Sequence, residues 1–242
     1  MFGFGDPVAF LIGCLFLIPA IVVAMPVHEM GHAFAAVWMG DPSPRNRGFL
    51  RPQLRAFIHP YGVVAVFLAN VGWGKPVPVN EYRLDGAGRK VVWALGGPVA
   101  NLVVAAVFGV ALRVLAANDI LPDPNTLVQP ALGYVASVVY AIYFLNLSFF
   151  AFNLLPIPGL DGWRVVEALL RGHYPRFFFD VSMRMQTIWI ICVAIIVIGP
   201  IFLRFDILGA VVGIFYQPAA TAIVGQCTDY TSLHPCPLSA RF

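Results

Sequence analysis

The stretch VAFLIGCLFLIPAIVVAMPVHEMGHAFAAVWM, residues 8–39, decides the fold. It is long and apolar enough for a helix that crosses a bilayer, which needs about 20 apolar residues. Only near its end do ionisable side chains appear, at His28, Glu29 and His32. We therefore predict a membrane helix over residues 8–39, kinked at Pro26, that carries ionisable groups inside the membrane.

The remainder of the chain repeats this pattern of long uncharged runs. Hydrophobic residues make up 60% of the 242 residues and charged residues 11%, which is far too apolar for a soluble domain. Further uncharged intervals cover Val91–Leu112, Pro124–Leu160, Met185–Leu203 and Ile207–Thr228. We predict an all-α polytopic membrane protein with about five spanning helices, in one membrane-embedded domain (1–225) followed by a flexible tail (226–242).

The net charge of +3 is small and the basic residues are dispersed, so no nucleic-acid partner is expected and the lipid bilayer is the expected surrounding. Lys and Arg gather in residues 40–90 and again after Asp161, beside the apolar runs. By the positive-inside rule both segments belong on the cytoplasmic side, with the N-terminus outside.

Within the first basic segment, the apolar run Tyr61–Gly74 has 14 residues, which is short for a spanning helix. We predict a re-entrant element on the cytoplasmic side. If this run crossed the membrane, Asp161 would end on the opposite face from His28 and His32. Residues Gly72–Asn80 then alternate Pro and Val, which favours an edge strand or a loop over a helix.

His28-Glu29-Met30-Gly31-His32 fits the pattern H-E-x-x-H. Residues four apart on a helix share one face, so the two imidazoles can bind one metal ion while Glu29 accepts a proton from bound water. Catalytic zinc needs a third protein ligand. Asp161, the first charged residue after the 37 uncharged residues 124–160, is the best candidate, and the alternative role for it is an N-cap of the following helix.

Three blocks of the chain resemble the signature blocks of the site-2 protease family of intramembrane zinc metalloproteases. They are His28–His32, Gly97-Pro98-Val99-Ala100-Asn101, and Asn153-Leu154-Leu155-Pro156-Ile157-Pro158-Gly159-Leu160-Asp161-Gly162. Residues Gly72–Asn80 are also similar to a segment of compact prokaryotic members. We expect this chain to lack the PDZ or nucleotide-sensing domain of larger relatives.

This resemblance implies one Zn²⁺ per chain, bound by His28, His32 and Asp161, with Glu29 as general base and acid. It also implies that Asn153 and Asn101 lie near the substrate backbone or the oxyanion. Read from the residues alone, two Asn side chains in apolar spans equally fit hydrogen bonds between helices. The implied location is a bacterial or archaeal cell membrane, with the active site towards the cytoplasm.

The expected function is hydrolysis of peptide bonds in or near transmembrane segments of single-span membrane proteins. We expect Val77 and Val79 to lie in a strand that pairs with an unwound substrate. A metal-binding transporter and an inactive zinc-holding scaffold are the alternatives. Cys227, His234 and Cys236 form at most a weak metal pattern, and the oligomeric state stays open.

Overall fold

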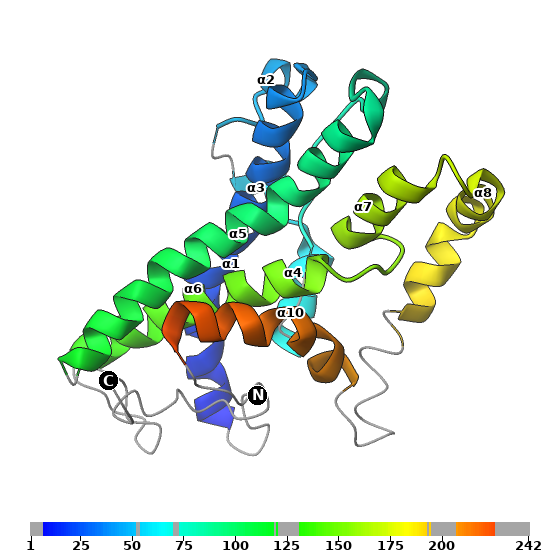
Figure 1. Ribbon diagram of the computed structural model, residues 1–242. Helices are drawn as coiled ribbons and strands as arrows, with labels where there is room; N and C mark the ends of the chain where they lie inside the picture. The colour runs from blue at the N-terminus through cyan, green and yellow to red at the C-terminus, as the bar shows by residue number, and fades with distance from the viewer. Residues whose placement is uncertain are drawn as a thin grey trace.

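The computed structural model describes residues 7–51, 54–69, 73–118, 120, 131–192, 194 and 207–225 (Figure 1). The regular elements of this part are helices: α1 (Pro7–Trp38), α2 (Ser43–Asn46), α3 (Leu54–Phe57), α4 (Pro60–Ala69), the 3-10 turn η1 (Glu81–Arg83), α5 (Gly86–Ala117), α6 (Ala131–Asn153), α7 (Asp161–Leu170), α8 (Pro175–Met183) and α10 (Ile207–Val224). The prediction of an all-α protein is therefore confirmed for these residues.

Among the residues that the structure describes, three helices are long and apolar enough to cross a membrane. These spans are Gly13–Trp38 within α1, Gly86–Ala117 and Leu132–Asn153. α10 is apolar but shorter, and most of the predicted span Met185–Leu203 lies outside the described residues. The chain is an integral membrane protein in which three of the five predicted spans are found. The predicted tail, 226–242, also lies outside the described residues.

α4 has 10 residues. An α-helix of this length is about 15 Å long, roughly half of the hydrocarbon thickness of a bilayer. α4 is therefore too short to cross by itself, and the re-entrant element stays a prediction. The predicted edge strand is absent: across the described residues, the pairing at this point is a single bridge between Ile58 and Gly74. Pro76 and Pro78 lack the N–H that a strand ladder requires.

α6 lies between the other long helices and presents two buried faces. One face, with Leu145 and Phe149, packs against α1 at Ile21 and Met25. The other packs against α5 and α10, through Tyr143, Leu147, Val212 and Tyr216 among others. In Figure 1, α10 lies in front of α6 and α5 crosses α1. α6 is thus the central element of the core.

α5 exposes apolar side chains along one side. Val99, Val103, Val107, Val110 and Val114 are each about half exposed or more, at 49–62%. Their spacing of three and four residues places them on one helical face. Water would disfavour such a stripe, whereas lipid tails suit it, and this supports the membrane assignment.

The long helices alternate in direction. Asn101 contacts Ala24 and His28, while Trp93, earlier in α5, contacts the later residue His32, so α1 and α5 are antiparallel. Asn101 also contacts Asn146 of α6. The end of α1, the start of α5 and the end of α6 therefore meet, and α7 begins beside the ionisable residues of α1.

Candidate metal centre

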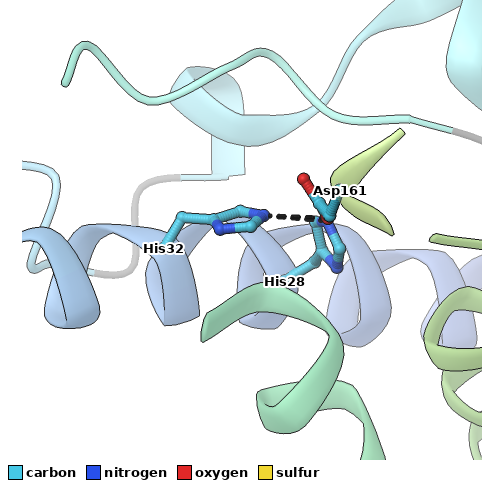
Figure 2. Close-up of side chains that lie close together, drawn as sticks. All are labelled: His28, His32 and Asp161. Carbon is cyan, nitrogen blue, oxygen red and sulfur yellow. Dashed lines mark hydrogen bonds and ion pairs between the residues drawn. The ribbon is translucent and has the colours of Figure 1, made fainter. Parts of the chain in front are cut away.

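His28 and His32 project from the same side of α1 towards Asp161 (Figure 2). Nε2 of His28 and Nε2 of His32 are 3.2 Å apart, and each lies 3.1 Å from Oδ2 of Asp161. All three residues are buried, with 4–6% of their surface exposed. The structure thus brings the three predicted ligands together, although 129 positions separate His32 from Asp161.

This triangle of atoms fits a zinc ion. Tetrahedral zinc bound by nitrogen and oxygen at about 2.0–2.1 Å holds its ligand atoms about 3.3–3.4 Å from one another. The observed separations of 3.1–3.2 Å are close to that value. Three protein ligands also leave the fourth tetrahedral position open for water or substrate, as catalytic zinc sites require.

The hydrogen bonds behind the imidazoles fix the tautomer that zinc needs. Nδ1 of His32 lies 2.9 Å from the carbonyl oxygen of Trp93, which can only accept. Nδ1 of His32 therefore carries the hydrogen, and Nε2 is left with a lone pair that faces the centre. Nδ1 of His28 lies 2.7 Å from Oδ1 of Asn101, and the same reasoning applies.

Asn101 is itself held by two further bonds. Its Nδ2 donates to the carbonyl of Ala24 at 3.1 Å and to Oδ1 of Asn146 at 2.8 Å, and Asn146 donates to Ile142 at 2.8 Å. With both amide hydrogens donated, Oδ1 of Asn101 is the acceptor for His28. The structure therefore places Asn101 behind a metal ligand and between helices, where both Asn side chains are fully buried.

Sequence reasoning missed Asn146. It follows Asn101 in the same chain of hydrogen bonds, and it lies seven residues before Asn153 in an uncharged run. A second asparagine on the same apolar helix was the signal that could have found it. Asn153 itself donates to Phe149 at 3.0 Å, one turn back in α6, so this bond ties its amide to its own helix.

Small residues let α1 and α5 cross closely at the centre. A Cβ atom added at Gly96 would lie 2.7 Å from Cβ of Ala35, and one added at Gly97 would lie 2.7 Å from Cε1 of His28. Real Cβ atoms essentially never approach other heavy atoms so closely. Glycine at both positions is therefore required for α5 to pack against the imidazoles.

Glu29 belongs to α1, and its side chain contacts residues 73–80. It is 7% exposed, and its Oε2 accepts a hydrogen bond from the backbone N–H of Val77 at 3.2 Å. A Cβ atom at Gly74 would lie 2.8 Å from Oε1 of Glu29. Val79 instead packs beside Ala36, Leu84 and Trp93. Residues 73–80 therefore run past the predicted general base.

The turn that carries Asp161 is set by its sequence. Gly159 has a φ of +102°, a conformation that residues with a Cβ rarely adopt, and it redirects the chain after Pro156 and Pro158. Leu160, buried in the core, is the N-cap of α7. Asp161 is the first helical residue, and its carboxylate contacts the imidazoles, so the N-cap alternative does not describe it.

Arg164 is the second site residue that sequence reasoning missed, because its charge was used only to assign topology. Its Nη1 lies 3.2 Å from Oδ1 of Asp161, one helical turn away. The guanidinium group of Arg164 favours the ionised form of the Asp161 carboxyl group, which a ligand for a cation requires.

A cavity of 1330 Å³ lies next to the centre, lined among others by Val79, Trp93, Leu160 and Arg164. Three of these lining residues also surround the ligands: Trp93 orients His32, Arg164 contacts Asp161, and Leu160 precedes it. Residues 78–82 and 84–87 also line the cavity. The cavity is large enough for several side chains of an extended peptide.

Comparison with known proteins gives a consistent result. The model of peptidase family M50 matches residues 16–199. A Bacillus subtilis protein named "Putative zinc metalloprotease YwhC" is 32% identical over 161 residues, which cover 64% of this chain and 69% of that protein. A Mycobacterium tuberculosis protein named "Putative zinc metalloprotease Rip2" is 34% identical over 178 residues, covering 71% of this chain and 63% of that protein. No solved structure matches the chain.

Proposed function

This chain belongs to peptidase family M50, a family of membrane zinc metalloproteases, and from that premise we propose that it cleaves membrane-protein substrates in or near their transmembrane segments. The observation that carries the proposal is the buried triangle of His28, His32 and Asp161, with Glu29 beside it, among three apolar helices. Reactive groups buried among membrane helices are suited to substrates that are themselves in the bilayer.

The roles of the site residues follow from their positions. His28, His32 and Asp161 would hold one zinc ion, which when bound lowers the pKa of a water molecule and polarises the scissile carbonyl. Glu29 accepts the proton of that water as it adds to the carbonyl carbon, and then delivers the proton to the leaving nitrogen. The C–N bond then breaks and the second proton of the water passes to the released nitrogen, so that the products are a carboxylate and a protonated amine and Glu29 is ionised again.

Residues 73–80 are the proposed place for the substrate backbone, since a helical substrate must unwind before its peptide bond becomes accessible. Three of their backbone N–H groups are engaged: that of Lys75 with Phe57 at 2.7 Å, that of Val77 with Glu29 at 3.2 Å, and that of Asn80 with Asp41 at 2.7 Å. Pro76 and Pro78 have none. The segment therefore offers an extended substrate mainly carbonyl groups, with Val79 next to the cavity.

Substrates with a single transmembrane span fit this arrangement best, because one helix can reach the centre laterally from the lipid. Asn153, at the end of α6, is a further candidate contact for the substrate backbone. We assign the centre to the cytoplasmic side of a prokaryotic cell membrane, since the basic residues of 40–90 and 164–184 flank this end of the helices.

The test is cleavage of a panel of single-span substrates by the purified protein in liposomes, with and without a zinc chelator. Wild type, Glu29→Gln and the exposed α8 control Asp180→Asn are compared. We expect chelation and Glu29→Gln to abolish cleavage while Asp180→Asn cleaves normally. Cleavage unaffected by either treatment would overturn the protease assignment. Zinc binding without cleavage by wild type would instead favour a zinc-holding scaffold.

A further inference from the structure

We propose that Arg164 restricts Asp161 to binding the metal through one oxygen atom, and that this keeps the fourth coordination position open. The proposal rests on the metal centre described above and adds a positioning residue to it. Its basis is the way the two carboxylate oxygens of Asp161 are divided between partners.

The two oxygens of Asp161 face different groups. Oδ2 lies 3.1 Å from both imidazole nitrogens, whereas Oδ1 lies 3.2 Å from Nη1 of Arg164. Carboxylates bind metals through one oxygen or through both. An ion that takes both oxygens of Asp161 together with the two imidazoles already has four donor atoms. The hydrogen bond to Arg164 opposes this by engaging Oδ1.

Arg164 is held in place by a second contact. The central carbon of its guanidinium group lies 4.9 Å from the centroid of the Trp93 ring, within the range of a cation-π interaction. Trp93 is 5% exposed, and its carbonyl orients His32. Arg164 therefore contacts both the ligand Asp161 and Trp93, the residue that orients the ligand His32. These two contacts distinguish it from a mobile surface charge.

A second ion pair on α7, between two more exposed side chains, can be compared with the Arg164 pair. Arg171 pairs with Glu167 one turn along α7, and the two side chains are 54% and 24% exposed. In the Arg164 pair the arginine side chain is 39% exposed, but the carboxylate is only 6% exposed. Ion pairs with exposed partners are screened by water and constrain geometry little, whereas a buried carboxylate depends on its partner. Arg171 is thus a matched control for Arg164.

The experiment replaces zinc by Co²⁺, whose visible absorption is strong in four-coordinate sites and weaker when more ligands bind. Wild type, Arg164→Met, Arg164→Lys and Arg171→Met are compared in the full-length protein. We expect wild type and Arg171→Met to give the same strong band. Arg164→Met should give a clearly weaker band, as Oδ1 joins the metal, and Arg164→Lys an intermediate one, since an ammonium restores the charge but not the planar two-contact geometry.

Equal bands in wild type and both Arg164 variants would overturn the proposal, as would an equal loss in Arg164→Met and Arg171→Met. If Arg164→Met does not fold, Arg164→Lys decides by the same comparison. X-ray absorption at the zinc edge gives an independent count of the nitrogen and oxygen ligands. These readouts do not require catalysis, so a protein that bound Co²⁺ as expected but cleaved nothing would contradict the proposed function and leave the role of Arg164 supported.

Discussion

Oδ1 of Asn101 lies 2.7 Å from Nδ1 of His28, so a side chain in the middle of one membrane helix sets the tautomer of a metal ligand on another. Replacing Asn101 by Leu removes this acceptor at similar volume. Because such supporting hydrogen bonds orient the ligand, we expect zinc affinity to fall about 10- to 100-fold. Competition with a coloured chelator measures this directly.

Asn118→Leu is the control for that variant. Asn118 caps the same helix, where it is exposed and donates to Val114. Its replacement should leave zinc affinity within about twofold of wild type, since exposed sites far from the centre have little influence on it. Equal affinities in all three proteins would show that Asn101 does not position His28.

Gly97→Ala tests the close contact between α5 and the imidazoles. The new methyl group would lie 2.7 Å from Cε1 of His28 and 2.8 Å from Cδ2 of His32. The rings cannot move without losing their Nδ1 hydrogen bonds, so we expect loss of zinc and a destabilisation of about 1–3 kcal/mol. Gly88→Ala, which meets nothing within 4 Å, should keep both zinc and the melting temperature.

Val77→Pro and Val79→Pro separate two roles of residues 73–80. Val77→Pro removes the N–H that donates to Glu29, whereas Val79→Pro changes the backbone beside the cavity. We expect both to impair cleavage while zinc content holds, because neither residue is a ligand. Full cleavage by both variants would show that this segment does not contact the substrate.

We expect the free energy of unfolding to depend on pH because of Asp41. Burial raises the pKa of its carboxyl group, but hydrogen bonds from Ser43 and from the Asn80 backbone outweigh burial and lower that pKa below its usual value. The stability that Asp41 contributes is therefore complete above the unfolded pKa of about 4, and it is lost as the pH falls through the lower folded pKa.

Thermal unfolding of wild type and Asp41→Asn at several pH values measures that contribution. The variant should be less stable at pH 7, and the difference should shrink below about pH 4, where the unfolded carboxyl begins to be protonated. Loss of zinc in acid affects both proteins equally and cancels. A difference that is independent of pH would show that the ionised form of Asp41 is not the stabilising one.

Much of the site could be predicted from the sequence because its chemistry depends on local spacing and on helix direction. Two imidazoles one turn apart must share a face, and an even number of crossings after α1 returns Asp161 to the same side. The supporting residues could not be predicted in this way. Whether Asn101, Asn146 or Asn153 faces a ligand depends on how each helix is rotated about its axis, which side-chain packing in three dimensions decides.

The strand prediction shows the same limit. The alternation of Pro and Val at 76–79 correctly excluded a helix, but the pattern does not reveal that the N–H of Val77 binds Glu29. Arg164 was interpreted as a topological charge because its partner, Asp161, was already assigned to the metal. A carboxylate has two oxygens, however, and the sequence does not show that they have different partners.

The central claim is that His28, His32 and Asp161 bind one zinc ion. The most direct measurement is the zinc content of purified wild type and of His28→Ala, His32→Ala and Asp161→Ala, combined with X-ray absorption at the zinc edge. We predict one zinc per wild-type chain, bound by two imidazole nitrogens and by oxygen, and a loss of zinc in each variant. Full zinc occupancy in Asp161→Ala, with an unchanged absorption spectrum, would contradict the account.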